Sequence, residues 1–115
     1  MTQALSAPIH AANHIDAFID ALWLEDGLSK NTLEAYRRDL TLYAQWLITV
    51  DKGVDETIEV DINAYFSAKH ASTKATSANR RLTVLKRYFR WAMRERFIAA
   101  DPTLKLQAAK QALRV

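Results

Sequence analysis

The chain has 115 residues, of which 50% are hydrophobic, 10% aromatic and 25% charged. This composition is typical of one small soluble domain and excludes a disordered tail or a two-domain enzyme. The longest apolar runs are only a few residues, far short of the roughly 20 that a membrane-spanning helix needs. The absence of cysteine excludes disulfides, thiol catalysis and thiolate metal sites.

The N-terminus has neither the basic nor the apolar region of a secretory signal, so we expect a protein of the reducing cytoplasm. Two glycines and two prolines in the whole chain allow few turns and therefore long elements. We predict an all-α fold.

Residues 1–13 are small, polar and patternless, and are predicted to form a flexible arm. The first helix is predicted from an N-cap at Asn13 to about Glu25, with Gly27 as its end. Helical spacing places five of its residues in the core: Ile15, Phe18, Ile19, Leu22 and Trp23.

The second helix is predicted from an N-cap at Ser29 to about Val50, with Gly53 as its terminator. At about 3.6 residues per turn, one stripe of this helix is apolar and the opposite face is polar. The stripe comprises Leu33, Tyr36, Leu40, Tyr43 and Leu47, and the polar face comprises Asn31, Glu34, Arg38, Thr41 and Gln45. Arg37 flanks the stripe, where its stem can lie on the core edge with the guanidinium free.

An acidic connection covers residues 51–60 and precedes a third helix, predicted from about Asp61 to Ala71. Ile62, Tyr65 and Phe66 form its expected core face. A polar loop over residues 71–76 follows.

The fourth helix is predicted from an N-cap at Thr76 or Ser77 to about Arg96. Its core stripe is Ala78, Leu82, Leu85, Phe89 and Met93, and the opposite side carries Arg80, Thr83, Arg87 and Arg94. Val84 and Trp91 also fall on that polar side. We therefore expect the C-terminal half to be packed on two sides and only the N-terminal half to be open to a ligand.

The helical domain is predicted over residues 14–102, because the residue before Pro102 is pushed out of the helical region. Residues 103–115 are expected to form a linker or a short fifth helix.

The charges are distributed unevenly around the net value of +3. Residues 74–96 carry eight cations and one acid, whereas residues 1–61 carry eleven acids and four cations. Clustered cations of this kind are a candidate footprint for nucleic acid. A solvated helix face explains them equally well from charge alone.

Metal and enzyme sites are poorly supported by the sequence. His10 and His14 have the spacing of a metal pair, but no carboxylate or third histidine stands near them in sequence, and His70 is isolated. Zinc-protease, nucleophile-elbow and phosphate-loop motifs are absent. We expect no metal and no cofactor.

Two helix N-terminal halves combine hydroxyl or amide side chains with arginines. The second helix offers Ser29, Lys30, Asn31, Thr32, Arg37 and Arg38, and the fourth offers Lys74, Thr76, Ser77, Asn79, Arg80, Arg81, Lys86 and Arg87. Helix N-termini favour phosphate, and arginine can bind guanine O6 and N7 together. The pattern fits the major groove of duplex DNA. The alternative is that the hydroxyl residues are only helix caps.

The run NTLEAYRRDL at residues 31–40 and the run TSANRRLTVLKRYFRW at residues 76–91 resemble the N-terminal core-binding domain of tyrosine recombinases, most of all the bacterial Xer type. The resemblance covers about Ile15 to Pro102. It implies a SAM-like orthogonal bundle of four main helices that forms half of a clamp around a recombination site. In relatives, helix 1 helps to contact neighbouring protomers. The implied process is recombination or integration of DNA, with chromosome dimer resolution favoured.

Carried over by position, the resemblance puts residues of the second and fourth helices near the DNA: Thr32, Tyr36, Arg37, Arg38, Thr76, Ser77, Asn79, Arg80 and Arg87. Lys30, Asn31, Lys74 and Arg81 complete our predicted DNA-binding set. Tyr36 also lies on the predicted core stripe, so its hydroxyl reaches phosphate only at the rim. The family's catalytic residues belong to a second domain, expected after Val115.

The predicted function is therefore sequence-specific binding of double-stranded DNA by a chain without its own active site. The expected partners are a recombination site and, in a full-length protein, other recombinase protomers, with no membrane and an isolated domain that is monomeric. The alternative is a helical protein interaction module whose basic face docks an acidic partner. A self-contained enzyme is a third hypothesis and requires a catalytic group that the sequence does not reveal.

Overall fold

A computed structural model describes residues 14–69 and 75–106 of the chain. The chain divides into two compact units, Met1–Glu56 and Thr57–Val115. The described residues contain helices and turns but no strand, which confirms the all-α prediction. No helix among them is long and apolar enough to cross a membrane. The predicted arm at residues 1–13 lies outside the described residues, as do residues 107–115 of the linker or fifth helix predicted over 103–115.

The first unit begins with an α-helix over residues 14–21 that continues as the π-helix η1 (Leu22–Asp26). Ile15, Phe18, Ile19 and Leu22 are buried, as predicted. Trp23 is a correction, because it is 57% exposed. The prediction assumed α-helical spacing, whereas Trp23 lies in the π-helix η1, whose i→i+5 hydrogen bonds change the direction in which successive side chains point. Gly27 ends the helix with a left-handed φ of 62°, as expected.

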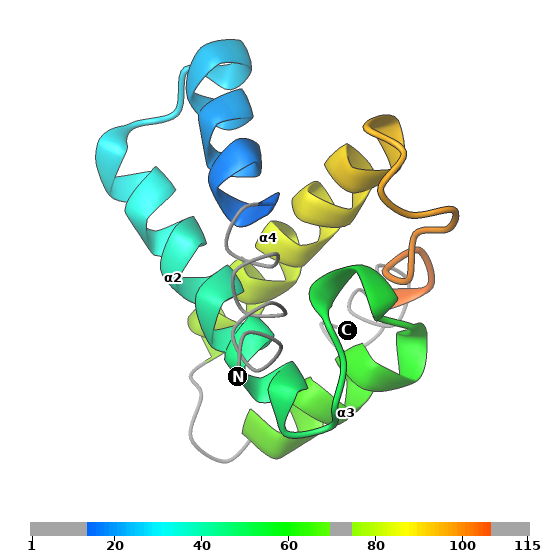
Figure 1. The fold of residues 1–115 in the computed structure, drawn as a ribbon. Coiled ribbons are helices and arrows are strands. Elements are labelled where there is room, and N and C mark those ends of the chain that lie inside the picture. The colour runs from blue at the N-terminus through cyan, green and yellow to red at the C-terminus, as the bar shows by residue number, and fades with distance from the viewer. Residues whose placement is uncertain (1–13, 70–74, 107–115) are drawn as a thin grey trace, which may run out of the picture. The chain divides into compact units, whose positions relative to one another are not determined.

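α2 (Lys30–Ile48) starts at the predicted cap, where the Ser29 hydroxyl accepts a hydrogen bond from the Thr32 amide at 3.2 Å. Figure 1 shows α2 (cyan to green) joined to the first helix (blue) by a short turn. The predicted stripe is buried except for Tyr36, which is half-buried, and the predicted polar face is exposed. The stripe and the polar face are otherwise confirmed.

The end of α2 differs from the prediction. Gly53 is not the terminator: Asp51 takes the left-handed conformation, with φ 63°. The Asp51 amide donates to the Ile48 carbonyl and the Lys52 amide donates to the Leu47 carbonyl, both at 3.0 Å. These are the two hydrogen bonds of a Schellman motif, which satisfies the last carbonyls of a helix.

The acidic connection contains a short 3-10 helix, η2 (Val54–Glu56), which the sequence did not indicate. Val54 is 3% exposed and forms part of the core. His14 Nδ1 lies 2.7 Å from Asp55 Oδ2, so η2 is also fastened to the first helix.

The second unit begins with α3 (Glu59–Lys69). The Ile58 amide donates to Asp61 Oδ2 at 3.0 Å, which is the side-chain bond of a capping box. Asp61 is therefore the third residue of the helix, and the predicted start at Asp61 was late. Ile62 and Tyr65 are buried as expected, whereas Phe66 is half-buried.

α4 (Ala75–Arg94) begins before the predicted caps, so Thr76 and Ser77 lie inside the helix. Residues 71–74 of the predicted loop lie outside the described residues. Leu85 and Phe89 are buried as predicted, but Met93 is 41% exposed and Ala78 and Leu82 are half-buried. The stripe is rotated, because the buried residues are Val84, Leu85, Tyr88, Phe89 and Ala92.

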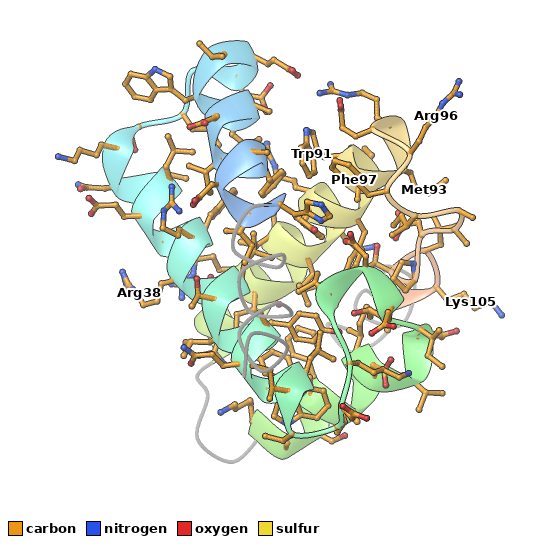
Figure 2. The ribbon with its side chains drawn as sticks, viewed as in Figure 1. Arg38, Trp91, Met93, Arg96, Phe97 and Lys105 are labelled. Carbon is orange, nitrogen blue, oxygen red and sulfur yellow. The ribbon has the colours of Figure 1, made fainter. Side chains whose placement is uncertain are left out.

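A second Schellman motif ends α4. Arg96 has φ 66°, and the Phe97 amide donates to the Ala92 carbonyl at 2.8 Å. The rings of Trp91 and Phe97 then meet edge to face at 5.4 Å, near the C-terminal end of the helix (Figure 2). This contact fixes the direction in which the chain leaves α4.

Candidate nucleic-acid interface

The N-terminal half of α2 presents most of its candidate residues to solvent. Lys30, Asn31 and Arg38 are exposed, and the Arg38 side chain extends away from the helix in Figure 2. Thr32 is half-buried, and its hydroxyl accepts a hydrogen bond from the Ser29 hydroxyl at 3.0 Å. The cap therefore orders two hydroxyls at the helix start. This surface offers cations, an amide and the positive end of the helix dipole to an anion.

Arg37 is exposed, but it is not free as the sequence suggested. Its Nη1 donates to Asp16 Oδ1 of the first helix. Asp16 was not among the candidate residues predicted from the sequence, so this pair was missed. The available signal was weak: opposite charges on two consecutive helices that a short turn joins.

Tyr36 lies at the rim of the core rather than inside it. It is half-buried, whereas the other three tyrosines, Tyr43, Tyr65 and Tyr88, are 0–1% exposed. A rim position is what a phosphate contact by its hydroxyl requires.

The candidates on α4 are less accessible than expected. Asn79, Arg80, Arg81 and Arg87 are all half-buried, whereas the exposed polar positions of this helix include Thr83, Arg90 and Arg94. The described residues thus contradict the expectation that only the N-terminal half of α4 is open. The rotation of the buried stripe explains the difference. Lys74 and the side chains of Thr76 and Ser77 lie outside what the structure describes.

Asn79 is also notable for a buried polar atom. Its Oδ1 has no hydrogen-bond partner among the described residues. Arg80, Arg81 and Arg87 each have interactions within the chain. These side chains are therefore partly committed to the fold.

Lys86 belongs to the basic run but has a structural task. Its Nζ donates to the Thr103 carbonyl at 2.9 Å, while Asp101 Oδ1 accepts from the Thr103 amide and hydroxyl at 2.8 and 2.6 Å. Burial lowers the pKa of Lys86, the charge of Asp101 opposes that effect, and the charge of Arg90 adds to it. Thr103 is 1% exposed. Lys86 thus ties the segment after α4 to the helix.

The structure holds no cluster of three or more metal-ligating side chains among its described residues. His14, considered above as one member of a metal pair, lies against Asp55 instead. His10 and His70 are outside the described residues.

The α2 candidates all lie in the first unit, and the described α4 candidates all lie in the second. Within the first unit, the structure gathers Lys30, Asn31 and Arg38 on the exposed part of one helix. Exposed residues of the α2 group therefore form a candidate surface within the first unit.

Comparison with known proteins gives matches over most of the chain. Residues 15–96 match a family model described as "Phage integrase, N-terminal SAM-like domain". Tyrosine recombinase XerD of Ralstonia nicotianae is 56% identical over 119 residues, which covers 100% of this chain and 39% of that relative. Tyrosine recombinase XerD of Proteus mirabilis is 40% identical over 97 residues, with 84% of this chain and 31% of the relative covered.

A third relative, Tyrosine recombinase XerD of Pseudomonas aeruginosa, is 40% identical over 95 residues, with 80% of this chain and 31% of the relative covered. The chain therefore spans less than two fifths of the length of these relatives.

Proposed function

The chain belongs to the family of phage integrase N-terminal SAM-like domains, and on that premise we propose that it binds double-stranded DNA. The observation that carries the proposal is the family match over residues 15–96, which includes both basic helices. The relatives named above are tyrosine recombinases, and recombination acts on DNA. The proposed role is one half of a clamp around a recombination site.

The α2 surface is proposed as the main contact. Arg38 and Lys30 are exposed cations within the first three turns of the helix, and Asn31 adds an exposed amide. Cations of this kind neutralise phosphates and release condensed counterions, which supplies sequence-independent affinity. Arginine and asparagine side chains can also form paired hydrogen bonds to guanine and adenine edges in the major groove.

Helix α4 is proposed as the second contact. The candidates at α4 are Lys74, Thr76, Ser77, Asn79, Arg80, Arg81 and Arg87. The α2 group has three further members, Thr32, Tyr36 and Arg37. Arg80 and Arg87 are half-buried, and we propose that the ends of their side chains reach phosphate while their stems lie on the fold.

We propose that this chain contributes DNA binding and no bond-breaking step. Tyr43, Tyr65 and Tyr88 are 0–1% exposed, so their hydroxyls cannot approach a phosphate as nucleophiles. Tyr36 is half-buried at the rim of the core, where we propose that its hydroxyl contacts phosphate without acting as a nucleophile. Strand cleavage would then need residues that other parts of a recombinase supply.

The process that we favour is site-specific recombination by a Xer-type protein in the cytoplasm, with resolution of chromosome dimers as its purpose. The three relatives described above all carry the XerD name. Other protomers and the recombination site are the proposed partners.

Titration of a fluorescent duplex with the wild-type chain and with Arg38→Glu tests the proposal. We expect duplex binding at low salt that weakens about tenfold or more in the variant, because a charged contact becomes a repulsion. Arg96→Glu is the matched control, since Arg96 is an exposed arginine outside the predicted set. Arg80→Gln tests the contribution of α4 without reversing a half-buried charge.

Circular dichroism of each variant shows whether the helices are intact. No duplex binding by the folded wild-type chain would contradict the proposal, and equal losses in Arg38→Glu and Arg96→Glu would contradict the assigned surface. Binding to acidic polypeptides in place of DNA would favour the alternative, a protein interaction module with a basic docking face.

A further inference from the structure

A pair of opposite charges lies within the proposed DNA-binding surface. Arg37 Nη1 donates to Asp16 Oδ1, and the two side chains are still 45% and 57% exposed. Asp16 comes from the helix at residues 14–21, which precedes α2 in the same unit. The Asp16 carboxylate thus forms an ion pair with Arg37, the guanidinium that we predicted to bind phosphate.

We propose that Asp16 is an internal competitor for the phosphate site of Arg37 and so sets the affinity of the α2 surface for DNA. The inference rests on the proposed function and adds a regulatory residue to it. In the free protein, the carboxylate partly neutralises the guanidinium. A DNA phosphate that approaches Arg37 meets both the cation and a like-charged oxygen, and the two anions repel each other.

The exposure of the pair decides how strong this competition is. Exposed ion pairs are weak and salt-screened, so a phosphate in a polyanion can displace the carboxylate. Asp16 therefore lowers affinity without abolishing binding. Arg38, the next residue, extends away from α2 and is the comparison on the same helix, because it has no ion pair with another described residue (Figure 2).

Counterions give the competition a second signature. When Arg37 moves to a phosphate, the freed carboxylate of Asp16 attracts a cation from solution. That uptake offsets part of the counterion release that drives binding. Removing the charge of Asp16 should therefore make the salt dependence of DNA binding steeper, by up to about 0.9 in the log–log slope.

A purely structural role for Asp16 predicts the opposite result. If the pair only fastens the first helix to α2, its loss loosens the surface and weakens binding. The sign of the change in affinity separates the two roles.

The test is Asp16→Asn, which keeps an oxygen acceptor for Arg37 and removes only the charge. Asp20→Asn is the matched control, because Asp20 is exposed one turn further along the same helix. We expect Asp16→Asn to bind duplex about two- to fivefold more tightly than the wild type at low salt, a larger gain than that of Asp20→Asn. In an Arg37→Gln background, the gain from Asp16→Asn should fall to that of Asp20→Asn.

Thermal unfolding and circular dichroism of each variant report on the fold. If the wild type binds duplex and folded Asp16→Asn binds no more tightly than Asp20→Asn, the inference is wrong and the proposed function stands. An equal gain with and without Arg37 also overturns it. If neither the wild type nor Asp16→Asn binds duplex, the proposed function fails and the inference fails with it.

Discussion

Among the residues that the structure describes, two other than glycine adopt the left-handed backbone conformation, and both end helices. Asp51 has φ 63° and Arg96 has φ 66°. Gly27, with φ 62°, does the same for the first helix. Glycine signals such an end from sequence, whereas aspartate and arginine do not. This is why the end at Gly27 was predicted and Gly53 was wrongly chosen for α2.

The backbone of Arg96 yields a stability prediction. A side chain in the left-handed region meets a steric penalty that glycine avoids. Arg96→Gly should therefore stabilise the chain by about 0.5–1 kcal/mol, after allowance for the greater entropy of glycine in the unfolded state. Urea unfolding measures the change, with Arg96→Ala as the control that keeps the penalty. A glycine variant no more stable than the alanine variant would contradict this explanation.

Residue contacts distant in sequence mark the limit of prediction at this scale. The pairs Asp16 with Arg37 and His14 with Asp55 join residues from different elements. Periodicity and charge counts carry no information about which ions meet. Arg37 and His14 were therefore singled out in the sequence, but their partners Asp16 and Asp55 were not.

Helices were predictable as elements because their apolar residues repeat at helical spacing. Their starts were harder to place. Ser72, Thr73, Thr76 and Ser77 all stand near the start of α4, and any hydroxyl residue is an acceptable cap. The burial pattern also rotated in α4, where Val84 and Tyr88 are fully buried. In the sequence, Val84 and Trp91 indicated additional packing, because both are apolar residues on the side expected to be polar. The burial of Tyr88 was not predicted.

The anchoring of the segment after α4 by Lys86 gives a pH prediction. Because the pKa of Lys86 is lowered in the folded chain, the unfolded chain holds the proton to higher pH. The free energy of unfolding should therefore rise as pH increases from the lowered pKa toward the ordinary lysine value. The change should be small, because the ammonium is only partly removed from water.

Lys86→Met is the comparison, since methionine fills similar space and does not titrate. Urea unfolding of both chains at a series of alkaline pH values isolates the contribution of Lys86. We expect the stability difference to shift in favour of the wild type as pH rises. A difference that stays constant or shifts the other way would show that Lys86 is not desolvated by the fold.

For the molecule as a whole, the predicted fold class and the predicted family are confirmed. The all-α class follows from scarce turn residues, and the described residues contain helices without strands. The resemblance drawn from the two sequence runs is confirmed by the family match and by the recombinase relatives. The identity of the DNA-contacting residues stays a prediction, because exposure shows which side chains are accessible and not what they bind.

The central claim is that this chain binds duplex DNA through basic side chains that neutralise its phosphates. We expect the chain to neutralise about four phosphates, which corresponds to a log–log salt slope near −3.5. Measuring duplex affinity across a series of salt concentrations tests this most directly. We predict a linear plot with a slope near that value. A slope near zero, or equal affinity for an acidic polypeptide at every salt concentration, would contradict DNA binding through phosphate contacts.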